Sequence, residues 1–259
     1  VEINQHKVKP AIVETDLAIL ALVGDNMKNH QGLSGKMFSG LGNNNVNIRA
    51  IAQGASEKNI SAVVHKSDAK KALNTLHELF FEEKLKQLNL FVTGVGNVGE
   101  RFLAQIAKQS DYLKEHLKLN IRVVAIANSR KMLVNEKGID LENWKENLQQ
   151  GEVTTLDVFY QKVVSLNLRN SVFVDNTANQ QVSEMYEQYL RKNIGVVTCN
   201  KIACASDFEN YKTLKRVSRK YNAPFLFETN VGAGLPIIDT LKNLISSGDR
   251  VQKIQAVLS

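Results

Sequence analysis

The sequence predicts an α/β protein with two unlike parts, a ferredoxin-like unit followed by a doubly wound parallel sheet. Three observations support this prediction. The first third of the chain reads as strand, helix, strand, strand, helix, whereas strands and helices alternate regularly after residue 88. A glycine-rich turn joins the first strand of the second part to its first helix. We place the boundary at residues 83–87, where the apolar content falls.

The elements of the first part are short and bounded by turn residues. An apolar run that ends at Gly24, Asp25 and Asn26 predicts a strand over 18–23, and two further predicted strands, over 46–51 and 60–64, are separated by the turn-rich residues 54–59. Helical spacing of apolar residues predicts a helix over 32–41, and Asp68 is a favourable N-cap for a second helix. This order makes up most of a ferredoxin-like unit.

Longer units of strand and helix follow in the second part. The predicted strands span 88–93, 121–127, 171–175 and 195–198, and the predicted helices span 97–108, 182–192 and 208–221. Their alternation implies a parallel sheet that is covered by helices on both faces. The segment over 251–258 also reads as a strand.

Composition and charge narrow the class of protein. The 259 residues are 43% hydrophobic and 23% charged, which is typical of a globular protein and excludes extended disorder. No run approaches the roughly 20 apolar residues that cross a bilayer, so we expect no membrane partner. Cys199 and Cys204 form neither a disulfide framework nor a zinc pattern, which favours a reducing compartment. The net charge of +7 is scattered, which favours a phosphate-bearing small molecule over nucleic acid.

The strongest functional motif is a glycine loop that matches G-x-G-x-x-G. It follows a strand and opens a helix, which is the context that dinucleotide binding requires. The first glycine permits a tight turn, the second lets a pyrophosphate approach, and the third lets helix and strand pack closely. The motif consists of Gly94, Val95, Gly96, Asn97, Val98 and Gly99. We predict a dinucleotide site; the alternative is a tight turn without a ligand.

The end of the second strand bears on the choice of cofactor. NAD binders place a carboxylate there, whereas this chain has Asn128, Ser129, Arg130 and Lys131. A guanidinium and an ammonium beside a hydroxyl suit a 2′-phosphate, so NADP is preferred and NAD remains possible. The alternative is that the two basic residues form a solvated turn.

Two further segments lie where ligands bind in such sheets, at the carboxyl ends of strands. Thr177 and Ala178 follow the third strand, and Lys201 follows the fourth. An ammonium near a carbonyl can polarise it or relay a proton, although a lone lysine is more often a solvated charge. Glu228 precedes two glycines and a proline, a pattern that suits either a cation site or an ordinary turn before a helix.

Taken together, these motifs resemble a known pair of domains. Residues 24–27, 32–38 and 46–61 resemble the second regulatory ACT domain of aspartate kinases. The glycine loop, Ala-Asn-Ser-Arg, Asp-Asn-Thr, Thr-Cys-Asn-Lys and Glu-Thr-Asn-Val-Gly-Ala-Gly-Leu-Pro resemble homoserine dehydrogenase. The tandem is similar to the fusion point of a bifunctional aspartate kinase/homoserine dehydrogenase.

This resemblance implies a domain order and a reaction. We expect an ACT domain over 1–86, a Rossmann-type NAD(P)-binding domain over 87–225 and, over 226–259, the start of a truncated α+β substrate domain. Such enzymes interconvert aspartate 4-semialdehyde and homoserine with NAD(P)H, and their ACT domains sense an amino acid, for which threonine is the first choice here and lysine and methionine are the alternatives. It further implies a homo-oligomer in the cytoplasm, or in a plastid for a plant source.

The resemblance also implies roles for single residues. Residues 95–99 would hold the pyrophosphate, Arg130 and Lys131 the 2′-phosphate, Thr177 the nicotinamide side, and Lys201 would lie near cofactor and substrate. Glu228 and the carbonyls of Val231, Ala233 and Leu235 match a sodium site. Gln53, with Asn26 and Ile48 as neighbours, matches a position implicated in threonine sensing.

One departure leaves alternatives open. The family's catalytic segment, which ends in a lysine that transfers the alcohol proton, has no counterpart up to Ser259. We therefore expect a fragment that binds NADPH with negligible turnover. An amino-acid and nucleotide sensor without catalysis, or a different NADP-dependent dehydrogenase, remain the alternatives.

Overall fold

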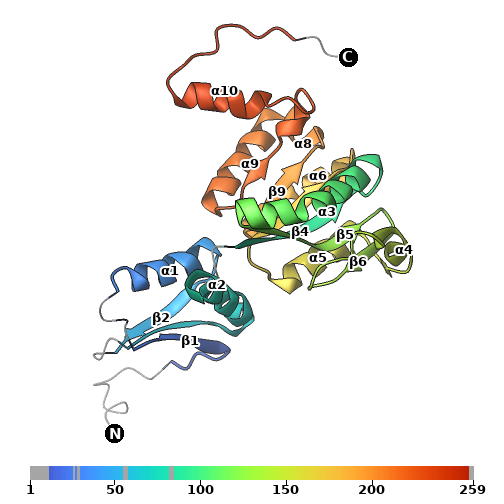
Figure 1. The fold of residues 1–259 in the computed structure, drawn as a ribbon. Helices are drawn as coiled ribbons and strands as arrows, with labels where there is room; N and C mark the ends of the chain where they lie inside the picture. Colours follow the sequence, from blue (N-terminus) through green and yellow to red (C-terminus); the bar gives the residue numbers. More distant parts are fainter. Residues whose placement is uncertain (1–11, 26, 28–29, 55–57, 82–84, 257–259) are drawn as a thin grey trace. The chain divides into compact units, whose positions relative to one another are not determined.

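The computed structural model describes residues 12–25, 27, 30–54, 58–81 and 85–256 (Figure 1). The chain divides into two compact units, Val1–Lys84 and Leu85–Ser259, and each is described here by itself. The α/β class and the unlike character of the two parts are confirmed.

The first unit is a three-stranded antiparallel sheet with two helices. Its strands, β1 (Leu17–Val23), β2 (Ile48–Gln53) and β3 (Asn59–His65), lie in the order β1-β3-β2. The helices α1 (Leu33–Asn43) and α2 (Ala69–Phe81) pack on one face of it, because alternate residues of β3 and the apolar faces of both helices share one core. Asp68 ends a short 3₁₀ turn that leads into α2.

A seven-stranded sheet forms the centre of the second unit, in the order β10-β9-β8-β4-β5-β6-β7. Its parallel strands are β4 (Lys86–Thr93), β5 (Leu119–Ala127), β8 (Ser171–Asp175), β9 (Gly195–Thr198) and β10 (Phe225–Leu226). The antiparallel edge consists of β6 (Lys131–Val134) and β7 (Glu152–Val153). The chain runs outward from β4 to β5 and then returns to β8 on the other side, which creates a topological switch point beside β4.

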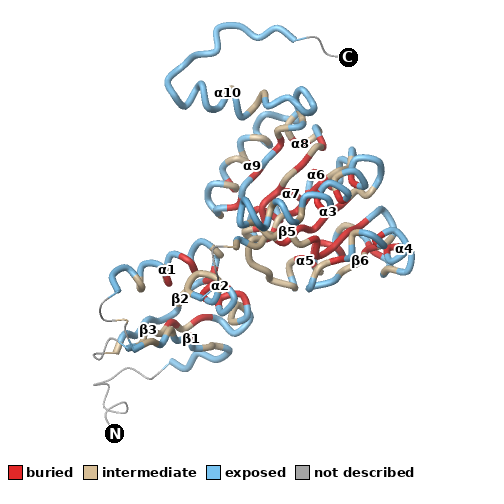
Figure 2. Tube along the Cα trace, in the orientation of Figure 1, coloured by how far each residue is buried: buried red, intermediate tan, exposed pale blue. Residues whose placement is uncertain are grey.

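Helices cover both faces of this sheet, as the alternation predicted. They are α3 (Asn97–Leu117), α4 (Trp144–Gln149), α5 (Leu156–Leu166), α6 (Gln180–Glu184), α7 (Tyr186–Arg191), α8 (Ile202–Ala205), α9 (Phe208–Lys220) and α10 (Ile237–Ser246). Alternate residues of β4 point into opposite cores: Phe91 packs in one, and Leu90 and Val92 pack in the other. The central strands are therefore buried along most of their length (Figure 2).

Three differences from the predicted elements have physical causes. The helix that opens at residue 97 runs on to Leu117, and its last turns lie in solvent, so they add no apolar periodicity. The predicted helix over 182–192 is two helices that meet at Met185. The predicted strand over 251–258 is wrong for its described part, 251–256, which has no regular structure; no described strand pairs with it.

Helix length and composition also bear on whether the described helices could cross a membrane. Among the described helices, none combines the length and the apolar character that crossing a bilayer requires.

Candidate functional site

The glycine loop between β4 and α3 needs glycine at two positions. Gly94 has a φ of 85°, and a Cβ there would lie 2.7 Å from Thr177 Cγ2 and 2.9 Å from the carbonyl carbon of Asn176. A Cβ at Gly99 would lie 2.0 Å from the Gly94 carbonyl oxygen. The first and third glycines therefore serve the tight turn and the close packing that the motif predicts.

Gly96 serves a different purpose. Its φ is −75°, and a Cβ on it would meet nothing within 4 Å, so neither backbone strain nor protein packing demands glycine there. It is the N-cap of α3, and no described side chain caps the amide groups of the first turn. The open space above Gly96 and these amide groups form a cradle that suits a pyrophosphate.

A cavity of about 410 Å³ lies at this loop, at the carboxyl ends of β4, β5 and β8. Six of the predicted residues line it: Gly94, Val95, Gly96, Asn128, Ser129 and Thr177. Asn97, Val98, Gly99 and Ala178 are their neighbours in the chain and do not line it. The cavity lies at the switch point of the sheet, where parallel sheets bind their ligands.

Other wall residues were missed by the sequence reasoning. Thr154, Thr155, Leu156 and Phe159, at the start of α5, supply a wall that is partly apolar, and the loop and first turn of α6 supply Asn179, Gln181 and Val182. Thr155 Oγ1 accepts a hydrogen bond from Val158 N at 3.3 Å and so caps α5. A threonine N-cap before the apolar run over 156–166 was the signal that could have located this wall.

The turn after β5 treats its two basic residues differently. Asn128 Oδ1 accepts hydrogen bonds from the backbone N–H groups of Arg130 and Lys131, both at 2.8 Å. The Lys131 ammonium donates to the Gln149 carbonyl, whereas the Arg130 guanidinium is exposed and has no partner among the described residues. Neither of these two basic side chains lines the cavity. The two residues that precede them, Asn128 and Ser129, do line it.

A polar cluster lies buried behind the cavity. Asp175, at the end of β8, accepts hydrogen bonds from Thr177 N at 2.7 Å, Tyr186 Oη at 2.5 Å and Asn200 Nδ2 at 3.0 Å. Tyr186 Oη also lies 2.7 Å from Thr198 Oγ1. Burial and the neighbouring Asp175 raise the pKa of Tyr186, so its hydroxyl stays protonated and donates to the carboxylate.

Lys201 lies next to this cluster, at the start of α8. Its carbonyl accepts hydrogen bonds from Cys204 N and Ala205 N, and its side chain is exposed and does not line the cavity. Burial raises the pKa of the Cys199 thiol, and it raises that of Cys204 to about 11. Both thiols are therefore protonated at neutral pH and are poor nucleophiles.

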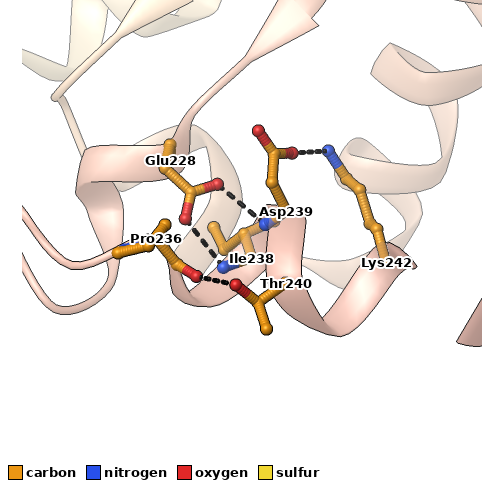
Figure 3. Close-up of polar contacts among 6 residues, drawn as sticks. All are labelled: Glu228, Pro236, Ile238, Asp239, Thr240 and Lys242. Atoms are coloured by element: carbon orange, nitrogen blue, oxygen red, sulfur yellow. Dashed lines mark hydrogen bonds and ion pairs between the residues drawn. The ribbon is translucent and has the colours of Figure 1, made fainter. Parts of the chain in front are cut away.

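Glu228 caps a helix in the structure (Figure 3). Its carboxylate accepts hydrogen bonds from Ile238 N at 2.8 Å and Asp239 N at 2.9 Å, at the N-terminus of α10. The Leu235 carbonyl accepts one from Ile237 N at 2.9 Å, and Asp239 pairs with Lys242 at 3.0 Å. The predicted helix start at Pro236 is confirmed.

The other two predicted cation ligands, Val231 and Ala233, are exposed. A second cavity, of about 240 Å³, lies beside the Glu228 cap, and its walls include Thr198, Phe227 and Glu228. It opens at the carboxyl ends of β9 and β10, on the far side of β8 from the turn after β5.

The predicted effector residues are in the first unit. Asn26 lies outside the described residues. Ile48 and Gln53 are the first and last residues of β2, so their Cα atoms are about 16 Å apart by the rise of a strand. One small amino acid cannot contact both residues within a single unit.

Comparison with known proteins decides the family. Residues 94–228, more than half of the chain, match the family described as "Homoserine dehydrogenase, NAD binding domain". The chain belongs to this homoserine dehydrogenase family. Residues 20–80 match the family described as "ACT domain".

Curated relatives of this homoserine dehydrogenase family member are named as bifunctional enzymes. The bifunctional aspartokinase/homoserine dehydrogenase of Haemophilus influenzae is 39% identical over 259 residues, which are 100% of this chain and 32% of that protein. A chloroplastic bifunctional enzyme of Arabidopsis thaliana is 39% identical over 244 residues, 93% of this chain and 26% of that protein. The chain thus spans about a third or less of the length of these relatives.

Solved structures agree with the fold of the second unit. A hyperthermophilic archaeal homoserine dehydrogenase in complex with NADPH is 28% identical and has a TM-score of 0.52, covering 62% of this chain and 50% of that one. A Candida auris protein of unknown function is also 28% identical, with a TM-score of 0.54 over 64% of this chain and 45% of that one. The nicotinamide cofactor class is thereby supported for this family member.

Proposed function

We propose that the chain is the regulatory and cofactor-binding core of a bifunctional aspartate kinase/homoserine dehydrogenase. Its dehydrogenase part interconverts aspartate 4-semialdehyde and homoserine with NAD(P)H. The observation that carries the proposal is the 410 Å³ cavity directly at the glycine loop, in a chain that belongs to the homoserine dehydrogenase family. We assign residues 1–86 to the ACT domain, 87–225 to the cofactor domain and 226–259 to the start of the substrate domain.

The residues present fit a dinucleotide. The space above Gly96 and the capless first turn of α3 suit the pyrophosphate. The half with the adenine lies toward Ser129 and the wall at the start of α5, and the nicotinamide half lies toward Thr177 on the β8 side. When bound, the cofactor supplies the hydride. Lys201 supplies the positive charge near the substrate carbonyl, to polarise it or to relay a proton.

NADP is the preferred cofactor in this proposal. Arg130 has an exposed guanidinium without a partner among the described residues, next to Ser129 in the cavity wall. An unpaired guanidinium and a hydroxyl suit a 2′-phosphate, and no carboxylate stands at the end of β5 to hold a ribose hydroxyl instead. Lys131 contributes less than the sequence suggested, because its ammonium already donates to Gln149.

Threonine is the proposed effector, and the ACT domain is its proposed site. Gln53 is the residue we retain for it within a single unit, because Ile48 lies at the other end of β2. We expect the native protein to be a homo-oligomer in the cytoplasm, or in a plastid in a plant source.

The sodium ion that the resemblance implies is not part of this proposal. Both Glu228 oxygens accept hydrogen bonds from the amides that open α10, and the Leu235 carbonyl accepts one from Ile237 N. Glu228 and Leu235 are thus engaged in the start of α10, which is the reason for leaving a cation out of this proposal.

Titration of the 259-residue chain with NADPH, followed by nicotinamide fluorescence, tests the cofactor proposal. We expect saturable binding, with weaker binding of NADH, and calorimetric heats of binding for threonine that serine does not reproduce. We also expect homoserine oxidation in the bifunctional protein that carries this chain and negligible turnover by the chain itself. Absence of NADPH binding, or NADPH binding with no homoserine oxidation in the bifunctional protein, would contradict the proposal.

A further inference from the structure

Asp175 is a fully buried carboxylate that has no cationic partner. None of its side chain is exposed, and no ion pair joins it to a described lysine, arginine or histidine. A buried charge is costly unless hydrogen bonds replace its lost hydration. Here the backbone N–H of Thr177, the hydroxyl of Tyr186 and the amide of Asn200 replace it.

These hydrogen bonds form part of a closed ring of four residues, Asp175, Tyr186, Thr198 and Asn200. Tyr186 gives its only proton to Asp175, so the Thr198 hydroxyl donates to Tyr186 Oη. The backbone N–H of Asn200 donates to Thr198 Oγ1 at 2.9 Å, and its side chain donates to Asp175 at 3.0 Å. Each member is held from two sides, which gives the ring one arrangement.

The ring lies between the two cavities at the carboxyl edge of the sheet. On one side, Asp175 holds the N–H of Thr177 and Asn200 Nδ2 donates to the Asn179 carbonyl at 2.9 Å, and both of these partners line the larger cavity. On the other side, Thr198 lines the smaller cavity. The ring thus forms a partition whose hydrogen bonds reach the wall on which we place the nicotinamide.

Asn200 connects this partition to the segments that follow it. Its side-chain oxygen accepts a hydrogen bond from Ile202 N at 3.1 Å, at the start of α8, and its carbonyl accepts one from Asn230 Nδ2 at 3.2 Å. The backbone of Lys201 is therefore held between a buried residue, 2% exposed, and the first turn of α8. The exposed side chain of Lys201 therefore extends from a backbone that hydrogen bonds hold in place.

We propose that Asp175 and Asn200 are positioning residues of the dehydrogenase site. Through the ring they set the spacing between Thr177 on the nicotinamide wall and Lys201. This inference rests on the proposed function, because it needs a nicotinamide in the larger cavity. It assigns no chemical step to either residue: the carboxylate and the amide act only by holding their neighbours.

The test compares two probes on the 259-residue chain, NADPH and 2′-phospho-ADP-ribose, which lacks the nicotinamide. In Asn200→Ala we expect NADPH to bind about tenfold more weakly, because the wall that carries Thr177 and Asn179 is no longer held in place against the nicotinamide, with 2′-phospho-ADP-ribose unchanged. A role confined to general stability would weaken both probes alike. Equal loss for both, or no loss for NADPH, would overturn the inference.

Further variants guard against a misfolded protein. Asn89→Ala removes an equally buried asparagine, 1% exposed, from the other end of the sheet, and should leave both probes bound as in the wild type. Asp175→Asn and Asn200→Asp should each weaken NADPH, and the double variant, which again has one carboxylate and one amide, should recover part of the loss. No recovery in the double variant would count against the ring.

The wild type separates this inference from the proposed function. A wild-type chain that does not bind NADPH would remove the proposed function and the inference together. A wild type that binds NADPH, beside variants that bind it equally well, would remove only the inference.

Discussion

The two ends of the seven-stranded sheet use a buried asparagine in contrasting ways. Asn89 lies at the amino end, where its side-chain oxygen accepts hydrogen bonds from Gln87 Nε2 at 3.0 Å and from Arg122 Nη2 at 2.8 Å. Its Nδ2 donates to the Arg169 carbonyl at 2.7 Å. Asn200 lies at the carboxyl end and its side chain has as many partners. They are Asp175 in the ring, the Asn179 carbonyl in the wall of the larger cavity and Ile202 N at the start of α8.

The unpaired polar atoms show what this difference means. Among the described side chains of the second unit, the buried atoms without a partner are Thr93 Oγ1, Asn176 Nδ2 and Asn230 Oδ1. All three follow or end strands at the carboxyl edge, and Thr93 lines the larger cavity. The polar groups of Asn89 at the amino end are paired within the fold, whereas the carboxyl end leaves Thr93 Oγ1 unpaired beside the larger cavity.

The largest effect should come from the glycine loop. Gly99→Ala puts a Cβ 2.0 Å from the Gly94 carbonyl oxygen, so the loop must move by about an ångström, which we expect to weaken NADPH binding by about 100-fold and to lower stability. NADPH titration and urea unfolding measure the two effects. Gly96→Ala is the matched control: its Cβ meets no protein atom, so only binding should fall. Wild-type NADPH affinity in Gly99→Ala would contradict the assigned role of the loop.

At the amino end, Asn89→Ala should destabilise the fold and spare the site. It leaves the half-buried Arg122 guanidinium and the Arg169 carbonyl without their partner, at a cost of about 3 kcal/mol in the free energy of unfolding. Urea unfolding measures the loss, and NADPH titration below the transition should match the wild type. A change in NADPH affinity beyond about twofold would break the contrast between the two ends.

At the carboxyl end, the basic turn after β5 should decide which cofactor binds more tightly. Arg130→Ala should weaken NADPH binding by about tenfold, as expected for a lost charged hydrogen bond, and leave NADH unchanged. Lys131→Ala should cost NADPH no more than about twofold, because the ammonium is engaged by Gln149. Parallel titrations with both cofactors distinguish these cases. An unchanged NADPH affinity in Arg130→Ala would show that the turn is merely solvated.

The smallest effect should follow a change at Glu228. Glu228→Gln removes the negative charge at the N-terminus of α10 but keeps an acceptor, so we expect a loss of about 0.5–1 kcal/mol in the free energy of unfolding. Thermal unfolding measures it, with Glu209→Gln, another acidic residue in the first turn of a helix, as the comparison. NADPH affinity that is higher in NaCl than in KCl at equal ionic strength would instead support a sodium site.

Much of the second unit followed from its sequence, with instructive exceptions. The strands over 171–175 and 195–198 were predicted with their observed bounds, because each is a short apolar run that polar residues bracket. The region between residues 128 and 170 was left without elements, although it holds β6, α4, β7 and α5. Strands β6 and β7, of four and two residues, are too short for a periodic signal, and their pairing beside β5 decides them.

In the candidate site, too, some features could be predicted from the sequence and others depended on the tertiary structure. The sequence by itself determined the glycine loop, because the steric demands on Gly94 and Gly99 are local and leave a pattern in neighbouring residues. Only the tertiary structure decided which distant polar groups meet: Asp175 with Asn200, Lys131 with Gln149, and Glu228 with the start of α10. Such pairs depend on how separate segments pack, and no spacing along the chain records that.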